Sequence, residues 1–397
     1  MSRSGEQFSS RGRTDTELLH RMVGGDGEAA MEALLSGFQS RHPDVSLGDV
    51  TNENLSLAVK SRILKETPPD LWVEWPGKNL FPYVEANVLA DISDVWNQSD
   101  MEQQYLDGPR GASEFDGVYH AVPLNIHRIN NLFYNVEVVE DAGVDPTSLE
   151  TPSDLVDALA TVEEAGYTGM AHQTGSPWSS FQMFATVLLG ETDAETYSAI
   201  FVDGEVDANS DALESAVETT QSYLDYIPSD AGSISWTEAN NQVINGEAAF
   251  LHQGDWAAGT YITNDLTYGE EWDHVPFPGT EGYYALNMDS FPYPVNNPSP
   301  EATTLWCQFV GTAEAQEIFN PKKGSIPPRT DVDTDPFNDF SKDQIEDFQN
   351  SDAQPPSVAH GLAAPPAVKS SLGSAISSLN SGNEPSNVVS QMSSAYQ

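Results

Sequence analysis

SWTEANNQVINGEAAFLHQGDWAAG, residues 235–259, combines a helix, a turn and a buried strand in one short stretch. Residues 242–244 are expected to close an amphipathic helix, Asn245-Gly246 to form the turn, and residues 247–251 to form the strand. The Gly-Asp-Trp turn that follows places Trp256 at an edge of the sheet. Ligands bind where the strands of an open α/β sheet end, so an indole there offers a flat ring to a ligand. The alternative is a core role, which is more common for a lone Trp.

The same alternation of strands and helices runs through the first part of the chain. Residues 1–15 are expected to be disordered. The expected elements then follow in order: a strand at 17–23, a helix at 28–38, a strand around Val50, a helix at 57–64 and a strand at 70–73. Strands that alternate with helices indicate a mostly parallel sheet with helices on both faces.

Two short strands, 120–124 and 131–134, are expected to flank residues 125–130, where the chain first crosses from one lobe to the other. A mainly helical region follows, with helices expected at 152–162, 181–189, 194–201 and 212–226. Beyond residue 259 the pattern predicts a strand at 283–288, a helix from Ser299-Pro300 to about Gly311, and a helical tail with breaks over 343–397.

Length and charge limit the possible roles of the chain. The 397 residues favour two lobes, because single cores stop growing at about 250 to 300 residues. Lys and Arg total 16 against 61 Asp and Glu, a formal net charge of -45, so nucleic acids and anionic membranes are poor partners. Concentrated salt screens such a surface, since the Debye length is about 3 Å at 1 M, and the composition therefore indicates a halophile. The alternatives are a mesophilic acidic protein and a disordered acidic tail, but 39% hydrophobic residues favour folded domains.

The single cysteine, Cys307, excludes a disulfide framework and a thiolate metal cluster. No run of about 18 apolar residues predicts a membrane span. The first 17 residues hold three arginines and no apolar segment, so they do not form a secretory signal as they stand. Either the chain is intracellular or its leader is missing.

The sequence lacks a catalytic or metal-binding signature. With 61 acids, paired carboxylates occur by chance. Asp331, Asp333 and Asp335 resemble the start of a calcium loop, but Pro336 and Lys342 stand where such a loop needs Gly and Glu. There is no HExxH, GxSxG, P-loop or GxGxxG motif. We therefore expect no enzyme, no metal and no cofactor.

Single aromatic and polar residues recur beside small residues at turns. They are Trp75 in EWPGKN, Trp256 in GDWAAG, Asp289 in NMDSF, Lys323 in KKGSIP and His360 in AHGLAAP. A pyranose has C–H faces that lie on aromatic rings and hydroxyls that need directed donors and acceptors, so this combination suits a sugar. For Lys323 the alternative is a salt bridge to nearby acids.

Five segments in order resemble the extracellular sugar-binding proteins of ABC transporters, in particular their glucose and mannose-type branch. They are PPDLWVEWPGKNLFPYVEANVLADIS (68–93), VPLNIHRINNLFYN (122–135), NGEAAFLHQGDWAAG (245–259), NPKKGSIPPRTDV (320–332) and AHGLAAP (359–365). The likeness extends from Leu18 over nearly the whole chain.

The resemblance implies a periplasmic-binding-protein-like α/β fold of type II, in which two lobes close on one sugar. It implies one lobe from 1–126 plus 283–324 and the other from 127–282 plus 325–397. The residues implied to line the cleft are Glu28, Trp75, Trp256, Asp289, Lys323 and His360, with His127 and Trp178 as weaker candidates beside the hinge and pocket.

Two positions depart from the family pattern. Arg21 and Met22 stand where relatives commonly carry paired tryptophans on the first strand. Val73 and Trp75 stand where relatives often carry a Gln and a His or Lys beside the second strand. The ligand face of the first lobe is therefore altered, and Trp75 is a candidate substitute for the lost stacking ring.

The resemblance implies a monomeric extracellular receptor, held at the cell surface, that captures a glucose-like monosaccharide and delivers it to a membrane permease. Two other ligand classes, an oligosaccharide and a polyol, fit the same fold. A carbohydrate-active enzyme is the competing class, and it would require two carboxylates about 5 to 9.5 Å apart across the bound sugar.

Overall fold

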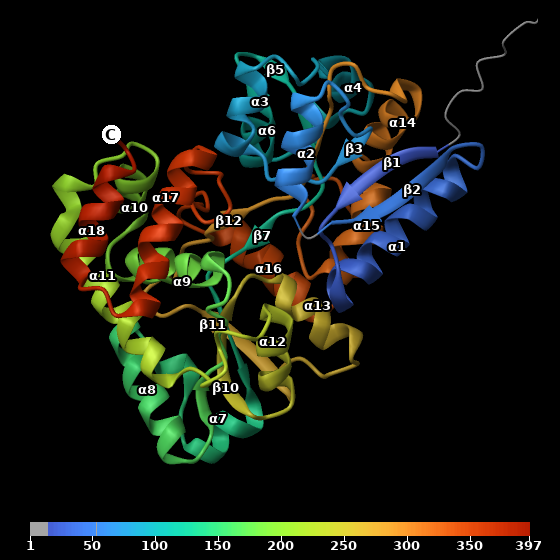
Figure 1. Cartoon of the computed structure of the whole chain (residues 1–397). Helices are drawn as coiled ribbons and strands as arrows, with labels where there is room; N and C mark the ends of the chain where they lie inside the picture. Colours follow the sequence, from blue (N-terminus) through green and yellow to red (C-terminus); the bar gives the residue numbers. More distant parts are fainter. Residues whose placement is uncertain (1–14, 53) are drawn as a thin grey trace, which may run out of the picture.

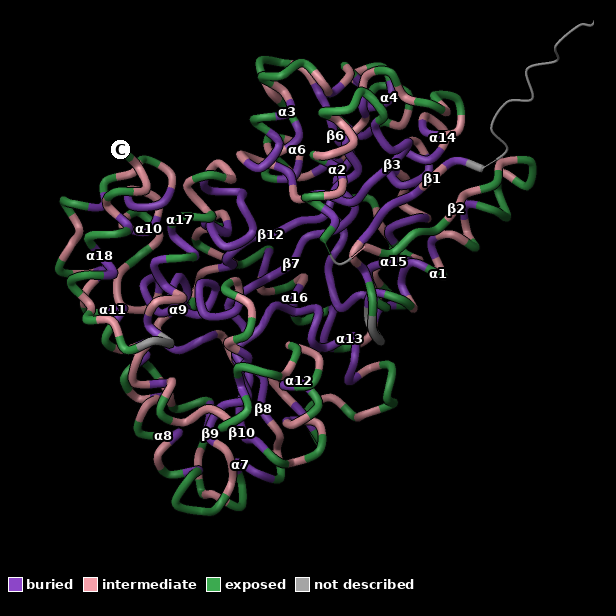
Figure 2. The backbone as a smooth tube through the Cα atoms, viewed as in Figure 1, coloured by how far each residue is buried: buried purple, intermediate pink, exposed green. Residues whose placement is uncertain are grey.

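The chain folds into two lobes joined by short crossing strands, as the computed structural model in Figure 1 shows for residues 15–52 and 54–397. The expected disorder of residues 1–15 falls almost wholly outside the described residues, and Asp15 begins the first strand. Buried backbone runs through the middle of each lobe in Figure 2, while exposed backbone follows the outer helices and loops. The described residues include no helix that is both long enough and apolar enough to cross a bilayer.

The first lobe is built on the predicted β-α-β-α-β unit. Its sheet has the order β2-β1-β3, with β1 Asp15–His20 parallel to both β2 Ser46–Thr51 and β3 Leu71–Trp72. The connecting helices are α1 Gly24–Arg41 and α2 Leu55–Leu64. Strand β1 ends three residues before the predicted end, at His20, so Arg21 lies just beyond the carboxyl edge of the sheet, where ligands of α/β folds bind.

Aromatic side chains fill the core of the first lobe. Phe38 of α1 meets the edge of Trp306 at 5.2 Å between ring centroids, and Trp96 stacks on Tyr119 at 4.1 Å. Trp306 comes from α14 Pro300–Val310, which begins and ends where the sequence predicts. The remaining elements of this lobe are η1 Gly77–Asn79, α3 Phe81–Glu85, α4 Ser93–Gln98, α5 Met101–Gln104, α6 Asp107–Ser113, β4 Glu114–Phe115, β5 Val118–Tyr119 and α15 Ala313–Lys323.

Short antiparallel pairs carry the chain between the lobes. β6 Ala121–Pro123 pairs with β13 Ser290–Pro292, and β7 His127–Arg128 pairs with β12 Leu286–Asn287. The predicted break at 125–130 therefore contains a strand of its own, and the strand predicted at 283–288 shrinks to β12. Asp289 sits in the gap between β12 and β13.

The second lobe has a four-stranded sheet of order β11-β8-β10-β9. The strands are β8 Asn131–Asn135, β9 Thr168–Met170, β10 Ala248–Gln253 and β11 Trp272–Pro276. Only β10 and β9 run parallel; β8 is antiparallel to both β10 and β11. Mostly parallel pairing thus holds in the first lobe but not in the second.

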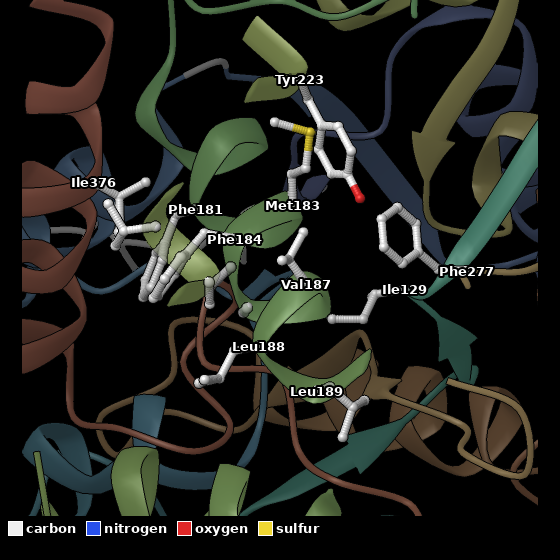
Figure 3. Close-up of a cluster of buried hydrophobic side chains, with 14 of the residues drawn as sticks. Ile129, Phe181, Met183, Phe184, Val187, Leu188, Leu189, Tyr223, Phe277 and Ile376 are labelled. Carbon is white, nitrogen blue, oxygen red and sulfur yellow. The ribbon is translucent and has the colours of Figure 1, made fainter. Parts of the chain in front are cut away.

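Helices surround the second sheet and form most of this lobe. In Figure 3, Phe181 and Phe184 of α9 lie near Ile376 of the C-terminal helices, whereas Met183 of the same helix lies beside Tyr223 of α11. The helices are α7 Val136–Ala142, η2 Pro146–Ser148, α8 Pro152–Glu164, α9 Pro177–Glu191, α10 Ala194–Phe201, η3 Asp207–Asn209, α11 Ser210–Tyr223, η4 Leu224–Tyr226, α12 Trp236–Ile244, α13 Trp256–Thr263, α16 Asp339–Asn350, α17 Pro366–Ser377, η5 Ser378–Ser381 and α18 Pro385–Ser394.

Trp256 stands where the sequence predicts a plain turn, but it is the first residue of helix α13. Gly254 permits this, because a Cβ on that residue would lie 2.2 Å from the Trp256 ring. The indole folds back over the end of β10 and is 8% exposed. Trp256 is therefore both a buried residue of the second lobe and a residue at the end of a strand.

Candidate ligand-binding site

Three tryptophans from separate parts of the chain surround the imidazole of His360. The ring centroids of Trp75, Trp256 and Trp178 lie 5.0, 5.6 and 6.3 Å from that of His360. Trp75 follows β3 of the first lobe, whereas Trp178 is the second residue of α9 and Trp256 the first residue of α13 in the second lobe. Aromatic rings from both lobes thus converge on one point.

His360 is held as a neutral polar group within this aromatic cluster. Its Nδ1 lies 2.7 Å from the hydroxyl of Ser357. Burial first, and then the charges of Lys369 and Arg21, lower the pKa of His360 to about 3. A neutral imidazole has one donor and one acceptor nitrogen, and no described residue hydrogen-bonds Nε2. Nε2 is therefore the atom that His360 offers to a ligand.

Asp289 anchors a network of polar side chains beside the rings. The Asn125 amide donates to Asp289 Oδ2 at 3.1 Å, and the backbone N–H of Asp289 donates to Asn125 Oδ1 at 2.7 Å. His127 Nε2 lies 3.5 Å from Asp289 Oδ2, while its Nδ1 bonds to Asp255. His127 also meets the edge of the Trp256 ring at 5.1 Å. The network therefore fixes the Asp289 carboxylate next to the aromatic cluster.

The charges in this network are coupled. Burial alone would raise the pKa of Asp289, but hydrogen bonding to His127 and the charges of Arg21 and Lys323 outweigh it and hold the pKa well below its usual range. Burial opposes protonation of His127, yet the contact with Asp255 raises the pKa of His127 above its usual value. Asp289 is consequently an ionised acceptor, which makes the stronger kind of hydrogen bond to a hydroxyl.

Lys323 reaches the site from the last residue of α15. Its Nζ lies 5.9 Å from the centroid of the Trp256 ring, and its side chain is 7% exposed. The helix ends at Gly324, whose φ is +78° and where a Cβ would lie 2.5 Å from the carbonyl oxygen of Asp255. Glycine thus allows the end of α15 to approach the end of β10.

Arg21 occupies the part of the site where the sequence departs from the family pattern. Its guanidinium carbon lies 4.0 Å from the Trp75 ring centroid, and its nitrogens lie 3.5 Å from Asp289 and 3.8 Å from Glu74. The stacking surface of Trp75 is therefore shared with a cation. Met22 and Val73, the other departures, are 6% and 0% exposed and belong to the core of the first lobe.

The predicted site residues thus gather in one place with one exception. Trp75, Trp256, Asp289, Lys323, His360, His127 and Trp178 are linked by the contacts above, whereas Glu28 is exposed on α1 and has no hydrogen bond or ion pair to them among the described residues. Glu28 stays a prediction. Asp331 of the calcium-like segment is bound by Arg329, at 2.7 and 2.8 Å, and the described chain holds no group of three or more potential metal ligands.

Sequence reasoning missed Asn125, Asp255, Glu74 and Lys369. Asp255 and Glu74 directly precede the two tryptophans that were singled out, so their position in GDW and EWP was the available signal. Asn125 lies two residues before His127 and is 2.9 Å from its Nε2, so its position in NIH was the available signal. Lys369 reaches the site only through the folding together of distant segments, for which the sequence holds no local signal.

Comparisons with known proteins show which family the chain resembles. The family described as bacterial extracellular solute-binding protein matches residues 48–346. XacG, a xylose/arabinose-binding protein of Haloferax volcanii, is 40% identical over 375 residues, which cover 92% of this chain and 80% of that protein. An uncharacterised ABC transporter extracellular-binding protein of Pyrococcus horikoshii is 32% identical, covering 96% of this chain and 87% of that protein. The solved structure of AcbH, a bacterial solute receptor with a preference for β-D-galactopyranose, has a TM-score of 0.83 at 18% identity and covers 96% of this chain and 97% of that one.

Proposed function

This chain belongs to the bacterial extracellular solute-binding proteins, and on that basis we propose that it is the sugar receptor of an ABC importer. The observation that carries the proposal is the cluster of Trp75, Trp178 and Trp256 around His360, with the ionised Asp289 alongside. Indole faces suit the C–H face of a sugar ring, and the carboxylate suits its hydroxyls. The sugar-binding relatives support the same ligand class.

The ligand in this proposal is a single monosaccharide ring, glucose-like in size. XacG is a xylose/arabinose-binding protein by name, so pentoses are the first sugars to test beside glucose. Within the proposal, Trp256 stacks on the ring, and Asp289, Lys323 and His360 bind its hydroxyls. Trp75 and Trp178 border the ring, and Glu28 contributes when the lobes hold ligand.

The proposed cycle is closure of two lobes, 1–126 plus 283–324 and 127–282 plus 325–397. The two largest cores support these limits, because one is formed by residues between Leu18 and Leu124 plus 291–319, and the other chiefly by residues between Ile129 and Phe277 plus 358–392. In the proposal the receptor is a monomer outside a halophilic cell, held at its surface, and it hands the sugar to a membrane permease.

Isothermal titration calorimetry in molar KCl tests the proposal. The panel is D-glucose, D-xylose, L-arabinose and D-galactose, with xylobiose to represent oligosaccharides. We expect saturable binding of one monosaccharide, weakened by about 1 kcal/mol or more in Trp256→Ala, because aromatic contacts contribute about 0.5 to 1.5 kcal/mol beyond burial. Trp236→Ala, a tryptophan of α12 outside the cluster, is the matched control. Absence of binding to every sugar, or an unchanged affinity in Trp256→Ala, would contradict the proposal.

A further inference from the structure

A groove opens beside the site, between the lobes. It has a volume of about 450 Å³ and is lined by α2 and α3 of the first lobe and by the start of α17 of the second. Ser56, Lys60 and Leu64 lie on the face of α2 that borders it. Glu74 and Lys369 also line it, and Lys369 Nζ lies 4.7 Å from the Trp75 ring centroid. The groove therefore adjoins the aromatic cluster directly.

The groove has more positive than negative charge on its walls, because two lysines and one carboxylate line it. Its charged lining residues are Lys60, Lys369 and Glu74. Glu74 faces Arg21 at 3.8 Å, and Arg21 faces Asp289 as well. Neither lysine forms an ion pair with a carboxylate in the part of the chain that the structure describes. With only 16 basic residues among 397, two unpaired lysines facing one groove call for an anionic partner.

Burial disfavours the charged form of Lys369 and lowers its pKa to about 8. The Glu74 carboxylate opposes this shift, and the smaller effects of Arg21 and Lys60 add to it. A bound anion would stabilise the charged form of Lys369 further.

One helix N-terminus adds to the positive potential in the groove. Pro366, which lines it, is the first residue of α17, and the amino ends of helices carry partial positive charge and favour anions. Helix α2 borders the groove from Ser56 to its last residue, Leu64, so its two ends offset each other. The groove thus combines two ammonium groups, one helix end and the hydroxyls of Ser56 and Ser370, which together match a carboxylate.

We propose that this groove binds the carboxylate of an acidic sugar, so that the receptor takes a hexuronic acid whose ring lies among the tryptophans and whose carboxylate lies between Lys60 and Lys369. This inference rests on the proposed sugar-receptor function. The net charge of -45 does not prevent it at high salt, since the Debye length is about 3 Å at 1 M and only local charges act on the ligand.

The test compares ligands that share one ring and differ at C6, where only one of them carries a charge. D-galacturonate, its methyl ester and D-galactose are titrated calorimetrically in 1 M KCl into the wild-type chain and into Lys60→Gln. Lys60 contacts none of the site's aromatic rings in the described structure, so its substitution isolates the charge. Lys65→Gln removes the same charge from the end of α2, outside the groove, and serves as the control.

We expect galacturonate to bind about tenfold more tightly than its methyl ester or galactose, since charged hydrogen bonds are roughly twice as strong as neutral ones. Lys60→Gln should abolish most of that preference and leave the affinity for the neutral ligands unchanged, whereas Lys65→Gln should keep it. Lys369→Gln should also remove most of the preference for the acid, but because Lys369 contacts the Trp75 ring, its effect on neutral ligands is not used as a test. D-glucuronate and its methyl ester, titrated in the same way, extend the test to the second hexuronate series.

The outcomes separate the two proposals. If neutral sugars bind and both uronates bind no better than their esters, the anion site is refuted while the sugar receptor stands. An acid preference that survives in both lysine variants also refutes the anion site. If no neutral or acidic sugar binds, the receptor function itself fails.

Discussion

Lys323 combines burial, charge and proximity to the Trp256 ring, which makes it the most consequential single side chain of the proposed site. Lys323→Met keeps the aliphatic stem but removes the charge that helps hold Asp289 ionised. We expect a larger loss of sugar affinity than in Trp256→Ala, because buried polar groups left without a partner cost about 1 to 3 kcal/mol. Calorimetry measures the difference. Lys322→Met, an exposed neighbour, is the control, and equal affinities in the two lysine variants would remove Lys323 from the site.

Histidines buried in the second lobe make stability depend on pH. His252 of β10 and His172 are buried beside the hydroxyls of Thr186 and Ser180, each at 3.1 Å. Burial lowers the pKa of His252 to about 3 and that of His172 to about 4. In the unfolded chain both titrate near about 6.5, so below that pH the unfolded state binds more protons. Their contribution to stability is present above about pH 6.5 and is lost as pH falls towards the folded-state values.

His252→Gln tests this sign directly. Each histidine that stays neutral in the fold adds a slope of about 1.4 kcal/mol per pH unit once the unfolded chain is protonated. Denaturant titrations between pH 6 and pH 5 should give a free energy of unfolding that falls less steeply in His252→Gln than in the wild type, by about 1 kcal/mol per pH unit. Parallel curves would show that His252 is not held neutral.

The sequence picks out side chains that the structure brings together, but it does not identify their partners. Trp256 and His360 were identifiable because turn residues mark them and because the segments resemble a family. The pairing of His127 with Asp255 spans 128 residues, and the Arg21 contacts with Asp289 span more. Such contacts depend on how β7 and β12 bring distant segments together, and no local pattern encodes that.

The end of α15 positions Lys323, and Gly324 makes this end possible. Its φ of +78° disfavours a side chain, and a Cβ would lie 2.5 Å from the Asp255 carbonyl oxygen. Gly324→Ala should therefore destabilise the fold and displace Lys323. Gly143 closes α7 with a φ of +71° but has open space around it, so Gly143→Ala isolates the conformational cost alone, roughly 1 kcal/mol. Chemical denaturation should show the larger loss for Gly324→Ala. Equal losses of unfolding free energy in the two variants would show that the short distance between Gly324 and the Asp255 carbonyl oxygen adds no cost.

Helices were predicted better than strands, for a physical reason. Helix α8 was predicted from Thr151-Pro152, and the Thr151 and Asp154 side chains do form a capping box; α10 has the predicted limits 194–201. These signals are local. The direction in which β8 pairs is set by the crossing strands, so the antiparallel sheet of the second lobe was not predictable from periodicity.

Besides the cluster of aromatic rings, other contacts join the two lobes in this structure. Lys78 Nζ of η1 donates to the carbonyl oxygen of Val202 at 2.8 Å, and the Lys78 backbone N–H donates to the Leu362 carbonyl oxygen at 3.3 Å. Apolar side chains of both lobes also pack together, since Ile126 and Met288 share one buried cluster with Leu362. The lobes therefore meet through polar contacts and an apolar cluster as well as through Lys369 against Trp75.

The net charge of -45 predicts that salt affects the stability of the whole molecule. Repulsion among carboxylates is weak when the Debye length is about 3 Å, at 1 M salt, and extends to about 10 Å at 0.1 M. We therefore expect the melting temperature to rise by more than about 5 °C between 0.1 and 1 M KCl. Screening saturates as the Debye length falls below the spacing of the charges, whereas exclusion of salt from the surface continues to act at higher concentration. A scan to 3 M KCl separates the two effects: a steep rise followed by a plateau indicates screening. A melting temperature that does not change with KCl concentration would contradict the halophilic interpretation, because the fold would then be stable without screening of its acidic surface.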